Sequence, residues 1–329
     1  MPQTYDVAAI GNAIVDVIAP ATDAFLAEHG LDKGAMMLVD AERSAELYAA
    51  MQTGVETSGG SAGNTIAGIA SFGGKAAYMG KVADDALGAT YAREMRACGA
   101  WFEVPPLVGG PATAVSMINV TPDGERTMCT YLGASNEFAA GDIDASVIEG
   151  SGIVFLEGYL FDAEAARRAF AKAAGLAHGS GRMIALTLSA LFVVERHREA
   201  LMGFIENQVD LLFANESEVT GLFQTDFDTA VARLAPHVKL AAVTRSEQGS
   251  VVLAGGERHA VPAFAVEKVV DTTGAGDQYA AGFMYGLATD RSLADCARLG
   301  SLAAAEVISH YGPRPQVSLR DLAAKEGLL

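Results

Sequence analysis

Positive charge and cysteine are both scarce in this sequence of 329 residues. Only 23 residues are Lys or Arg against 40 Asp and Glu, which gives a formal net charge of −17 at pH 7. So acidic a chain is a poor partner for nucleic acids or for anionic membranes, and we expect neither. The three cysteines, Cys98, Cys129 and Cys296, lie far apart without the spacing of metal ligands. We therefore expect buried thiols of a cytoplasmic protein.

Several familiar segments are missing as well. No apolar run is long enough to span a bilayer and no signal peptide is present, which predicts a soluble, cytoplasmic protein without a membrane partner. No Gly-x-x-x-x-Gly-Lys-Ser/Thr sequence occurs, so a P-loop is excluded, and the glycine cluster at 58–64 lacks the spacing of a dinucleotide-binding fingerprint. If this acidic protein handles phosphate, it must supply positive potential locally, from backbone amides, helix ends, bound metal and a few arginines.

The most informative stretch that is present covers residues 269–283. It begins with an apolar pair, Val269-Val270, that predicts the end of a strand, and apolar residues at four-residue spacing predict a helix over 277–288. Gly274-Ala275-Gly276 lies between them, and the two glycines allow the backbone amides to approach a ligand closely. These amides are the unpaired donors of a helix N-terminus. The stretch therefore predicts an anion hole.

A carboxylate stands on the rim of this predicted anion hole. Asp277 follows Gly276 directly, at the place where an anion is expected. The arrangement makes chemical sense if Asp277 is a general base, which takes a proton from a hydroxyl that attacks a phosphoryl group held by the amides. Taken alone, the same pattern also fits a helix cap after a glycine turn.

The first predicted strand, residues 5–10, leads into a second polar cluster. If the strand continues, Asn12, Ile14 and Asp16 point to one face, because side chains alternate along a strand. An amide beside a carboxylate offers donors and acceptors to the adjacent hydroxyls of a diol. A solvent-facing polar edge is an equally simple interpretation of these residues.

Predicted strands and helices alternate along most of the chain, which indicates a mostly parallel sheet covered on both faces. Six residues follow predicted strands: Gly11, Glu157, Thr187, Asn215, Thr244 and Asp271. We expect them to converge at one edge of the sheet, where such folds bind ligands. A β-hairpin predicted over 113–131 interrupts the alternation and belongs to a separate small β-rich piece, with Arg126 just after its turn.

Asn215 opens a predicted helix, and Glu218 lies three residues further on. This spacing fits a capping box, in which each residue satisfies a backbone amide of the other. The same pair also suits magnesium, bound through water beside nucleotide phosphates. Both interpretations stay open at this point.

Three motifs together resemble the ribokinase family of carbohydrate kinases, also called the PfkB family. They are Gly59-Gly60 with Asn64, Asn215 with Glu218, and Asp271-Thr272-Thr273-Gly274-Ala275-Gly276-Asp277. The resemblance spans essentially the whole chain, and the last motif is highly specific. Within the family, residues 11–16 and 187–192 are most similar to the adenosine kinase branch.

The resemblance implies a role for each matching residue. Asp277 would be the base for the 5′-hydroxyl, Gly274, Ala275 and Gly276 the anion hole, and Arg126 the residue that steadies the transferring phosphate. The acceptor would lie among Asn12, Ile14, Asp16, Gly59, Gly60, Asn64, Tyr159 and Phe192. The nucleotide would lie along Asn215, Thr244, Gly249 and Thr273. Asn215 and Glu218 would order magnesium through water, and Asp271 matches a loop that binds a monovalent cation such as K⁺ in some members.

The resemblance also implies a fold and a reaction. The fold is a ribokinase-like three-layer α/β sandwich with a mostly parallel central sheet, from residues 1–13, 59–106 and 135–329, plus a small β-rich lid from 14–58 and 107–134. The reaction is ATP- and Mg²⁺-dependent phosphorylation of a ribonucleoside, with adenosine converted to AMP. The alternatives are a kinase of a free sugar such as ribose, or a non-catalytic nucleoside- or sugar-binding regulator. Monomer and homodimer are left open.

Overall fold

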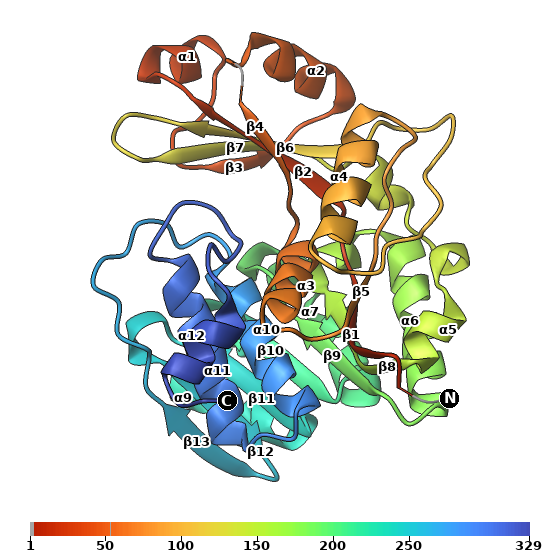
Figure 1. Ribbon diagram of the computed structural model, residues 1–329, viewed down its shortest axis with the longest axis vertical. Helices are drawn as coiled ribbons and strands as arrows, with labels where there is room; N and C mark the ends of the chain where they lie inside the picture. Colours follow the sequence, from red (N-terminus) through yellow and green to blue (C-terminus); the bar gives the residue numbers. More distant parts are fainter. Residues whose placement is uncertain (1–2, 53) are drawn as a thin grey trace.

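The computed structural model describes residues 3–52 and 54–329, which form two β-sheets (Figure 1). The larger sheet has eight strands in the order β13-β12-β11-β10-β9-β8-β1-β5. Their bounds are β1 (Tyr5–Ile10), β5 (Ala76–Met79), β8 (Ser151–Glu157), β9 (Met183–Thr187), β10 (Leu211–Asn215), β11 (Leu240–Thr244), β12 (Ser250–Ala254) and β13 (Glu257–Val261). Every pair from β5 to β11 is parallel, and β12 and β13 are added antiparallel at one edge.

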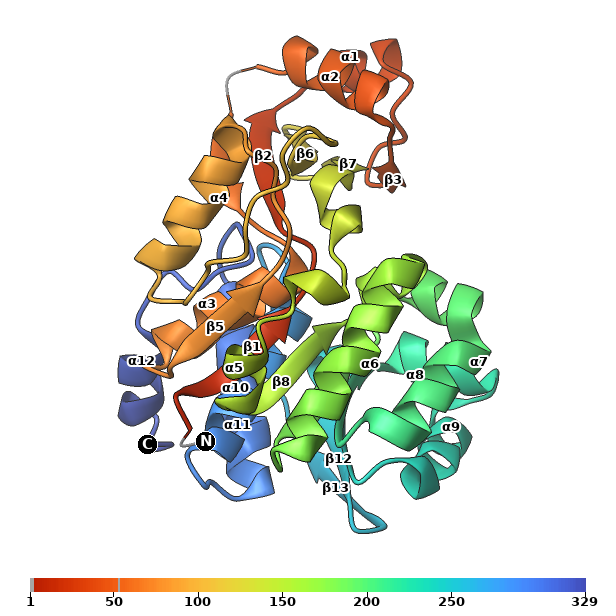
Figure 2. The same cartoon turned by 90° about the vertical axis from the view of Figure 1, so that its right-hand side faces the viewer.

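Helices cover both faces of the larger sheet (Figures 1 and 2). One face carries α3 (Ser61–Ser71), α10 (Ala275–Ala288), α11 (Leu293–Val307) and α12 (Leu319–Lys325). The other carries α5 (Ala145–Glu149), α6 (Glu164–Gly179), α7 (Leu191–Gln208), α8 (Glu216–Phe223) and α9 (Phe227–Leu234). No helix in the described part of the chain combines the length and the apolar character needed to cross a membrane.

The three layers follow from the alternation of side chains along each strand. In β1, Val7 and Ala9 pack into the core on the α3 and α10 side, whereas Ala8 and Ile10 pack into the core on the α6 and α7 side. A parallel sheet buried on both faces needs such continuous apolar strands. The predicted three-layer α/β class is confirmed.

The second sheet has five strands in the order β3-β7-β6-β2-β4. Their bounds are β2 (Ile14–Pro20), β3 (Met36–Leu38), β4 (Val55–Ser58), β6 (Ala114–Val120) and β7 (Arg126–Tyr131), so the predicted hairpin is present as β6 and β7. The helices α1 (Asp23–Glu28) and α2 (Ala41–Ala50) cover its outer face, and α4 (Ala86–Ala97) packs beside β2 and β4. All five strands fall within 14–58 and 107–134; that this unit moves as a lid remains a prediction.

One strand prediction was wrong. Val269 and Val270 belong to an irregular segment between β13 and α10, so Asp271 does not follow a strand. The amide of Val270 donates to the carbonyl of Ile308 at the end of α11, 2.8 Å away, and Val269 is 56% exposed. Because this segment pairs with a helix end, the apolar pair does not join the sheet. The helix predicted next to it is confirmed as α10.

Candidate active site

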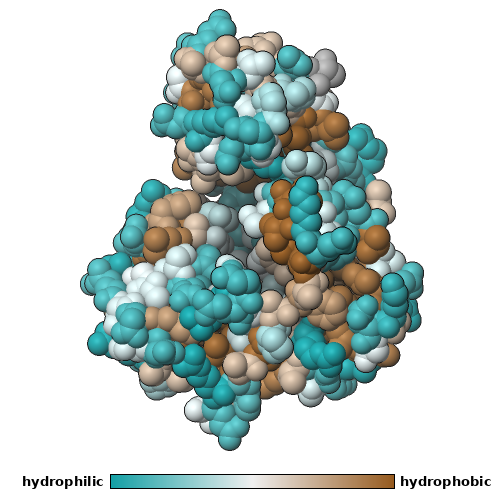
Figure 3. Space-filling model, turned by 90° about the vertical axis from the view of Figure 1, so that its left-hand side faces the viewer, coloured by the Kyte–Doolittle hydropathy of each residue, from teal (hydrophilic) through white to brown (hydrophobic). Residues whose placement is uncertain are grey.

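A cavity of ≈480 Å³ lies between the second sheet and the carboxyl ends of the parallel strands. The molecule is visibly hollowed between these two parts (Figure 3). Glu157, Thr187, Asn215 and Thr244, each at the end of its strand, line this cavity as predicted from the alternation of elements. The other site residues that it brings together are Asn12, Ile14, Asp16, Gly60, Asn64, Tyr159, Phe192, Glu218, Thr273, Gly274, Ala275, Gly276 and Asp277.

Asp277 lies in the first turn of α10 and is held by two donors from α3. The Ser61 hydroxyl donates to its Oδ1 at 2.6 Å, and Nδ2 of Asn64 donates to its Oδ2 at 3.2 Å. Burial raises the pKa of Asp277 from 3.8 to about 6, although the hydrogen bonds from Ser61 and Asn64 oppose the shift. A carboxylate with this pKa is ionised at neutral pH and still basic enough to take a proton.

The backbone before Asp277 forms the expected helix N-terminus. Gly274 is the N-cap residue of α10, and its φ of 79° favours glycine. A Cβ atom on Gly274 would lie 2.7 Å from atoms of Pro313, whereas one on Gly276 would meet nothing within 4 Å. The amide of Ala275 donates to the carbonyl of Thr272, which removes it from a ligand's reach. Within the described part of the chain, the amides of Gly274, Gly276 and Asp277 have no such acceptor and remain able to bind an anion.

A half-buried arginine sets the orientation of the Asn64 amide. Nε of Arg314 donates to Oδ1 of Asn64 at 3.4 Å, so the amide nitrogen of Asn64 is left for Asp277. A guanidinium has donors only, so it can be matched only by the oxygen of the amide. Arg314 therefore helps to keep the donor side of Asn64 on the proposed base.

The second asparagine of the site, Asn12, is oriented by a carboxylate. Its backbone N–H and its Nδ2 both donate to Oε1 of Glu157, at 3.3 and 3.0 Å. Oε2 of Glu157 accepts from the amide of Ala62 at 2.9 Å. Burial raises the pKa of Glu157 to about 7, against the opposing effect of these donors.

Asp16 is buried near the start of β2, close to Gly59 and Gly60. Neither position has room for a side chain. A Cβ on Gly59 would overlap the Asp16 carboxylate, and one on Gly60 would overlap the carbonyl oxygen of Asn12, so Gly59 packs behind the acid without lining the cavity. Burial raises the pKa of Asp16 to about 7, while the positive charges of Arg314 and Arg126 lower it. A group poised in this way can accept hydrogen bonds from neighbouring hydroxyls.

Apolar side chains from both units of the molecule line the cavity. The rings of Tyr159 and Phe192 lie 5.9 Å apart beside the ends of β8 and β9. On the second sheet, the parallel pairing of β3 with β7 puts Met36 next to Met128 on the cavity side. The space between them suits a flat apolar group.

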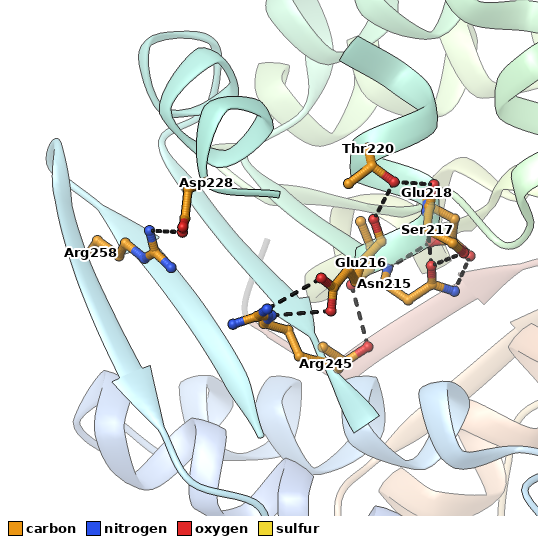
Figure 4. Close-up of polar contacts among 10 residues, drawn as sticks. Asn215, Glu216, Ser217, Glu218, Thr220, Asp228, Arg245 and Arg258 are labelled. Atoms are coloured by element: carbon orange, nitrogen blue, oxygen red, sulfur yellow. Dashed lines mark hydrogen bonds and ion pairs between the residues drawn. The ribbon is translucent and has the colours of Figure 1, made fainter. Parts of the chain in front are cut away.

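Asn215 and Glu218, which are predicted to lie on the nucleotide side, belong to a dense polar cluster (Figure 4). Asn215 and Glu218 make the capping box: Oδ1 of Asn215 accepts from the Glu218 amide at 2.9 Å, while the Glu218 carboxylate accepts from the amide of Asn215 at 2.9 Å and from its Nδ2 at 2.8 Å. Burial raises the pKa of Glu218 to about 7. Each carboxylate oxygen has a second lone pair, so a water molecule of hydrated magnesium can still bind.

Gly249 does not line the cavity and has a structural reason to be glycine. It closes the turn between β11 and β12 with a φ of 84°, and a Cβ there would overlap the carbonyl of Val261. Thr244, at the end of β11, does line the cavity. The side chain of Arg245 pairs through two nitrogens with Glu216, which joins the ends of β11 and β10 (Figure 4).

Arg126 points toward the loop before α10 and does not line the main cavity. Its Nη2 lies 2.8 Å from Oδ2 of Asp271, and its guanidinium lies over the ring of Tyr311. Asp271 also accepts from Gly312 and from both the amide and the hydroxyl of Thr273. Its carboxylate is thus fully occupied, and a monovalent cation at this loop remains a prediction. Nε and Nη1 of Arg126 are buried without a partner among the described residues, which leaves two donors for an anion.

Comparison with known proteins identifies the family. Residues 30–319 match the model of the pfkB family of carbohydrate kinases. The chain belongs to this family. Membership makes it a phosphotransferase that acts on an alcohol group and uses ATP, typically with Mg²⁺. No cluster of three His, Cys, Asp or Glu side chains within residues 3–52 and 54–329 could hold a metal ion.

Three relatives show how far the similarity to pfkB members extends. The crystal structure of an adenosine kinase from Sinorhizobium meliloti is 52% identical, with a TM-score of 0.91 over 98% of this chain and 99% of that one. A probable sugar kinase from Rhizobium etli CFN 42 is 47% identical, with a TM-score of 0.93 over 99% and 100% of the two chains. Adenosine kinase from Saccharomyces cerevisiae is 27% identical over 94% of this chain and 96% of its own length.

Three residues of this pfkB site carried no predicted chemical role: Ser61, Glu157 and Arg314. Ser61 and Arg314 act on the proposed base directly and through Asn64, and Glu157 holds Asn12. For Glu157, its position at a strand end could have indicated a role in the site, because buried polar residues at that edge of the sheet need partners. No local pattern marks Arg314, which lies 250 residues from its partner Asn64.

Proposed function

We propose that this protein transfers the γ-phosphoryl group of ATP to the 5′-hydroxyl of a ribonucleoside, with adenosine as the acceptor. The observation that carries the proposal is the placement of Asp277, a carboxylate with a pKa of about 6 beside the free amides of a helix N-terminus. A base next to an anion hole is what transfer of a phosphoryl group to a hydroxyl needs.

The work is divided among the residues around Asp277. Asn12, Ile14, Asp16, Gly60 and Asn64 hold the ribose, with Gly59 packed behind Asp16, and Asp277 takes the proton of the 5′-hydroxyl. ATP with magnesium supplies the phosphoryl group and neutralises part of its charge. Thr244 and Thr273 lie along the phosphates, Gly249 shapes the turn after Thr244, and Asn215 and Glu218 hold the hydrated metal. The amides of Gly274 and Gly276 stabilise the transferred group, and Arg126 joins them when the second sheet closes over the cavity as a lid.

Two facts favour a nucleoside over a free sugar. Phe192, Tyr159, Met36 and Met128 all line the cavity and form an apolar slot that a purine fills and that a free sugar leaves empty. In addition, the Sinorhizobium meliloti relative, 52% identical, is an adenosine kinase. The Rhizobium etli relative is described as a probable sugar kinase, so a free sugar remains the alternative acceptor for this protein.

A coupled ATP-turnover screen tests the proposal. Adenosine, 2′-deoxyadenosine, the other ribonucleosides, ribose and fructose are compared by kcat/KM. We expect adenosine to be best, 2′-deoxyadenosine weaker and ribose nearly inactive, because a site that hydrogen-bonds a hydroxyl discriminates strongly against its loss. A higher kcat/KM for ribose would refute the nucleoside assignment, and turnover of none of these acceptors would favour a non-catalytic binder.

Two variants of Phe192 test the aromatic contact within the same screen. Phe192→Ala should lower kcat/KM for adenosine and leave any ribose activity unchanged, since only the nucleoside has a base to stack. Phe192→Leu is the matched control, because it keeps the apolar volume and removes only the ring. If Phe192→Ala weakens both acceptors equally, the residue supports the fold and does not contact the base.

A further inference from the structure

The side-chain amide of Asn12 has one end paired and the other end free. Its Nδ2 donates to Oε1 of Glu157, and Glu157 itself is 1% exposed. Its Oδ1 is buried and has no hydrogen-bond partner among the described residues. Asn12 also lines the cavity. Burying a carbonyl oxygen without a donor is costly, so this oxygen is expected to meet a donor that a ligand brings.

The carboxylate of Glu157 decides which end of the amide is left for the ligand. The two ends of an asparagine amide have nearly the same shape, and a half-turn exchanges acceptor and donor. The ionised carboxylate of Glu157 only accepts, so in that state it binds the nitrogen end and leaves the oxygen end free. The amide of Ala62 fixes the other oxygen of Glu157, at 2.9 Å, and thereby limits rotation of the carboxylate.

We propose that Glu157 is a positioning residue that keeps Oδ1 of Asn12 as a hydrogen-bond acceptor and thereby selects acceptor substrates whose ribose hydroxyl donates at that point. The inference rests on the proposed kinase function and adds to it. Asp16, the neighbouring buried carboxylate, is also an acceptor. The ribose end of the site therefore demands two donors, which a vicinal diol supplies and an ether or a fluorine does not.

Exchanging the polarity of the pair tests the inference. Glu157→Gln alone keeps the 2.9 Å bond from Ala62 only if its nitrogen takes the place of Oε1. That nitrogen then donates to Oδ1 of Asn12 at the expense of the 3.3 Å bond from the Asn12 backbone amide, and it turns the nitrogen of Asn12 toward the substrate. Asn12→Asp alone puts two carboxylates against each other, since the nitrogen now 3.0 Å from Glu157 becomes an oxygen. In the double variant, the introduced glutamine amide donates to one oxygen of the introduced aspartate, and the other oxygen of that aspartate faces the substrate again. Both turnover and calorimetric binding of the acceptor are measured, so that a loss of affinity is separated from a loss of chemistry.

We expect each single variant to lower kcat/KM for the nucleoside at least about tenfold, mostly through KM, because the hydroxyl contact exists in the ground state and the transition state alike. The double variant should recover at least about tenfold over the Glu157→Gln protein. Asn207→Asp combined with Glu157→Gln is the control, because Asn207 bonds only within its own helix and should give no recovery. Losses that simply multiply in the double variant would overturn the inference.

The unmodified protein supplies an independent test if the Glu157 variants do not fold. Adenosines in which the 2′- or the 3′-hydroxyl is replaced by fluorine keep the size but lose the donor. At least one of them should fall about a hundredfold or more in kcat/KM. Equal turnover of both analogues and adenosine would overturn the inference while leaving the kinase function intact. If a free sugar proves to be the acceptor, the double-variant experiment is run with that sugar, so failure of the nucleoside assignment and failure of the Glu157 role are distinguished.

Discussion

Asp277→Asn should make the protein both more stable and nearly inactive, a combination that few other mechanisms produce. The substitution preserves the local hydrogen bonds: the Asn oxygen can accept from Asn64, and the Asn nitrogen can donate to the Ser61 hydroxyl, which then acts as acceptor. What disappears is the negative charge. Loss of a general base typically lowers the rate about a hundredfold to ten-thousandfold.

The gain in stability follows from the pKa of Asp277. The pKa rises from 3.8 in the unfolded chain to about 6 in the folded protein, so the folded state binds the proton more tightly. Stability is therefore lost as the pH rises from about 4 to about 6, and the full cost of the charge is present above that range. Two pH units correspond to about 3 kcal/mol, an upper limit because the carboxylate borders an open cavity where water screens it.

Thermal melts and pH–rate profiles measure these effects. For a chain of this length, 3 kcal/mol corresponds to a rise in Tm of at most about 4 °C, using ~2.1 cal/mol/K per residue for the unfolding entropy. The rise should be largest at pH 8 and shrink toward pH 4. Asp228→Asn is the control, since Asp228 is an exposed acid paired only with Arg258 at the surface. A lower Tm, or a kcat within tenfold of the unmodified enzyme, would refute the assignment.

The pH dependence of activity should share this origin. Because a base must be deprotonated, kcat/KM should rise with pH and level off above the acidic limb. Asp277 has a pKa of about 6, and the neighbouring Asp16 and Glu157 have pKa values of about 7, so the limb should fall between pH 6 and 7 and belong to the coupled group. A profile that is flat from pH 5 to 8 would contradict a catalytic carboxylate in this environment.

Four further variants test neighbouring parts of the site. Arg126→Ala should lower kcat more than it raises KM, because the two unpaired nitrogens of Arg126 are expected to meet the phosphate only when the second sheet closes over the cavity. Arg258→Ala, at a surface ion pair, is the control. A loss confined to the KM for the acceptor would contradict this role of Arg126. Glu218→Gln should raise the magnesium concentration at half-maximal activity, whereas a purely capping role predicts a stability loss of about 1 kcal/mol with normal magnesium dependence. Gly274→Ala should lower Tm, because residue 274 has a φ of 79° and a Cβ there would lie against Pro313. Gly276→Ala has open space around the added Cβ, so it should fold normally and weaken ATP binding. Equal losses of Tm in the two variants would argue against this geometry.

The parts of the structure that sequence could anticipate are those encoded over a few residues. The glycine pattern of 274–276 gave the helix N-terminus because only the local backbone is involved, and apolar periodicity gave α10. The wrong strand at Val269-Val270 shows the limit, since an apolar pair joins a sheet only if an edge is in reach. Local propensity does not carry that information.

The part of the site that could not be predicted from the sequence depends on contacts between distant segments. Glu157 meets Asn12 across 145 residues of sequence and Arg314 meets Asn64 across 250, so neither pairing has a local signature. The apolar slot needs the parallel pairing of β3 with β7, which joins strands from separate parts of the chain. The sequence shows which polar residues are present, but only the folded structure shows which of them are paired.

The short connections between the two sheets have a mechanical consequence. Only residues 11–13 join β1 to β2, and only Gly59 and Gly60 separate β4 from α3. These connections contain residues that we propose to hold the ribose, so any rotation of the second sheet about them changes the distances between those contacts. Substrate affinity and sheet orientation are then thermodynamically linked, and each must bias the other. Substitutions in α1 or α2, on the outer face of the second sheet, should therefore alter acceptor affinity without touching the acceptor.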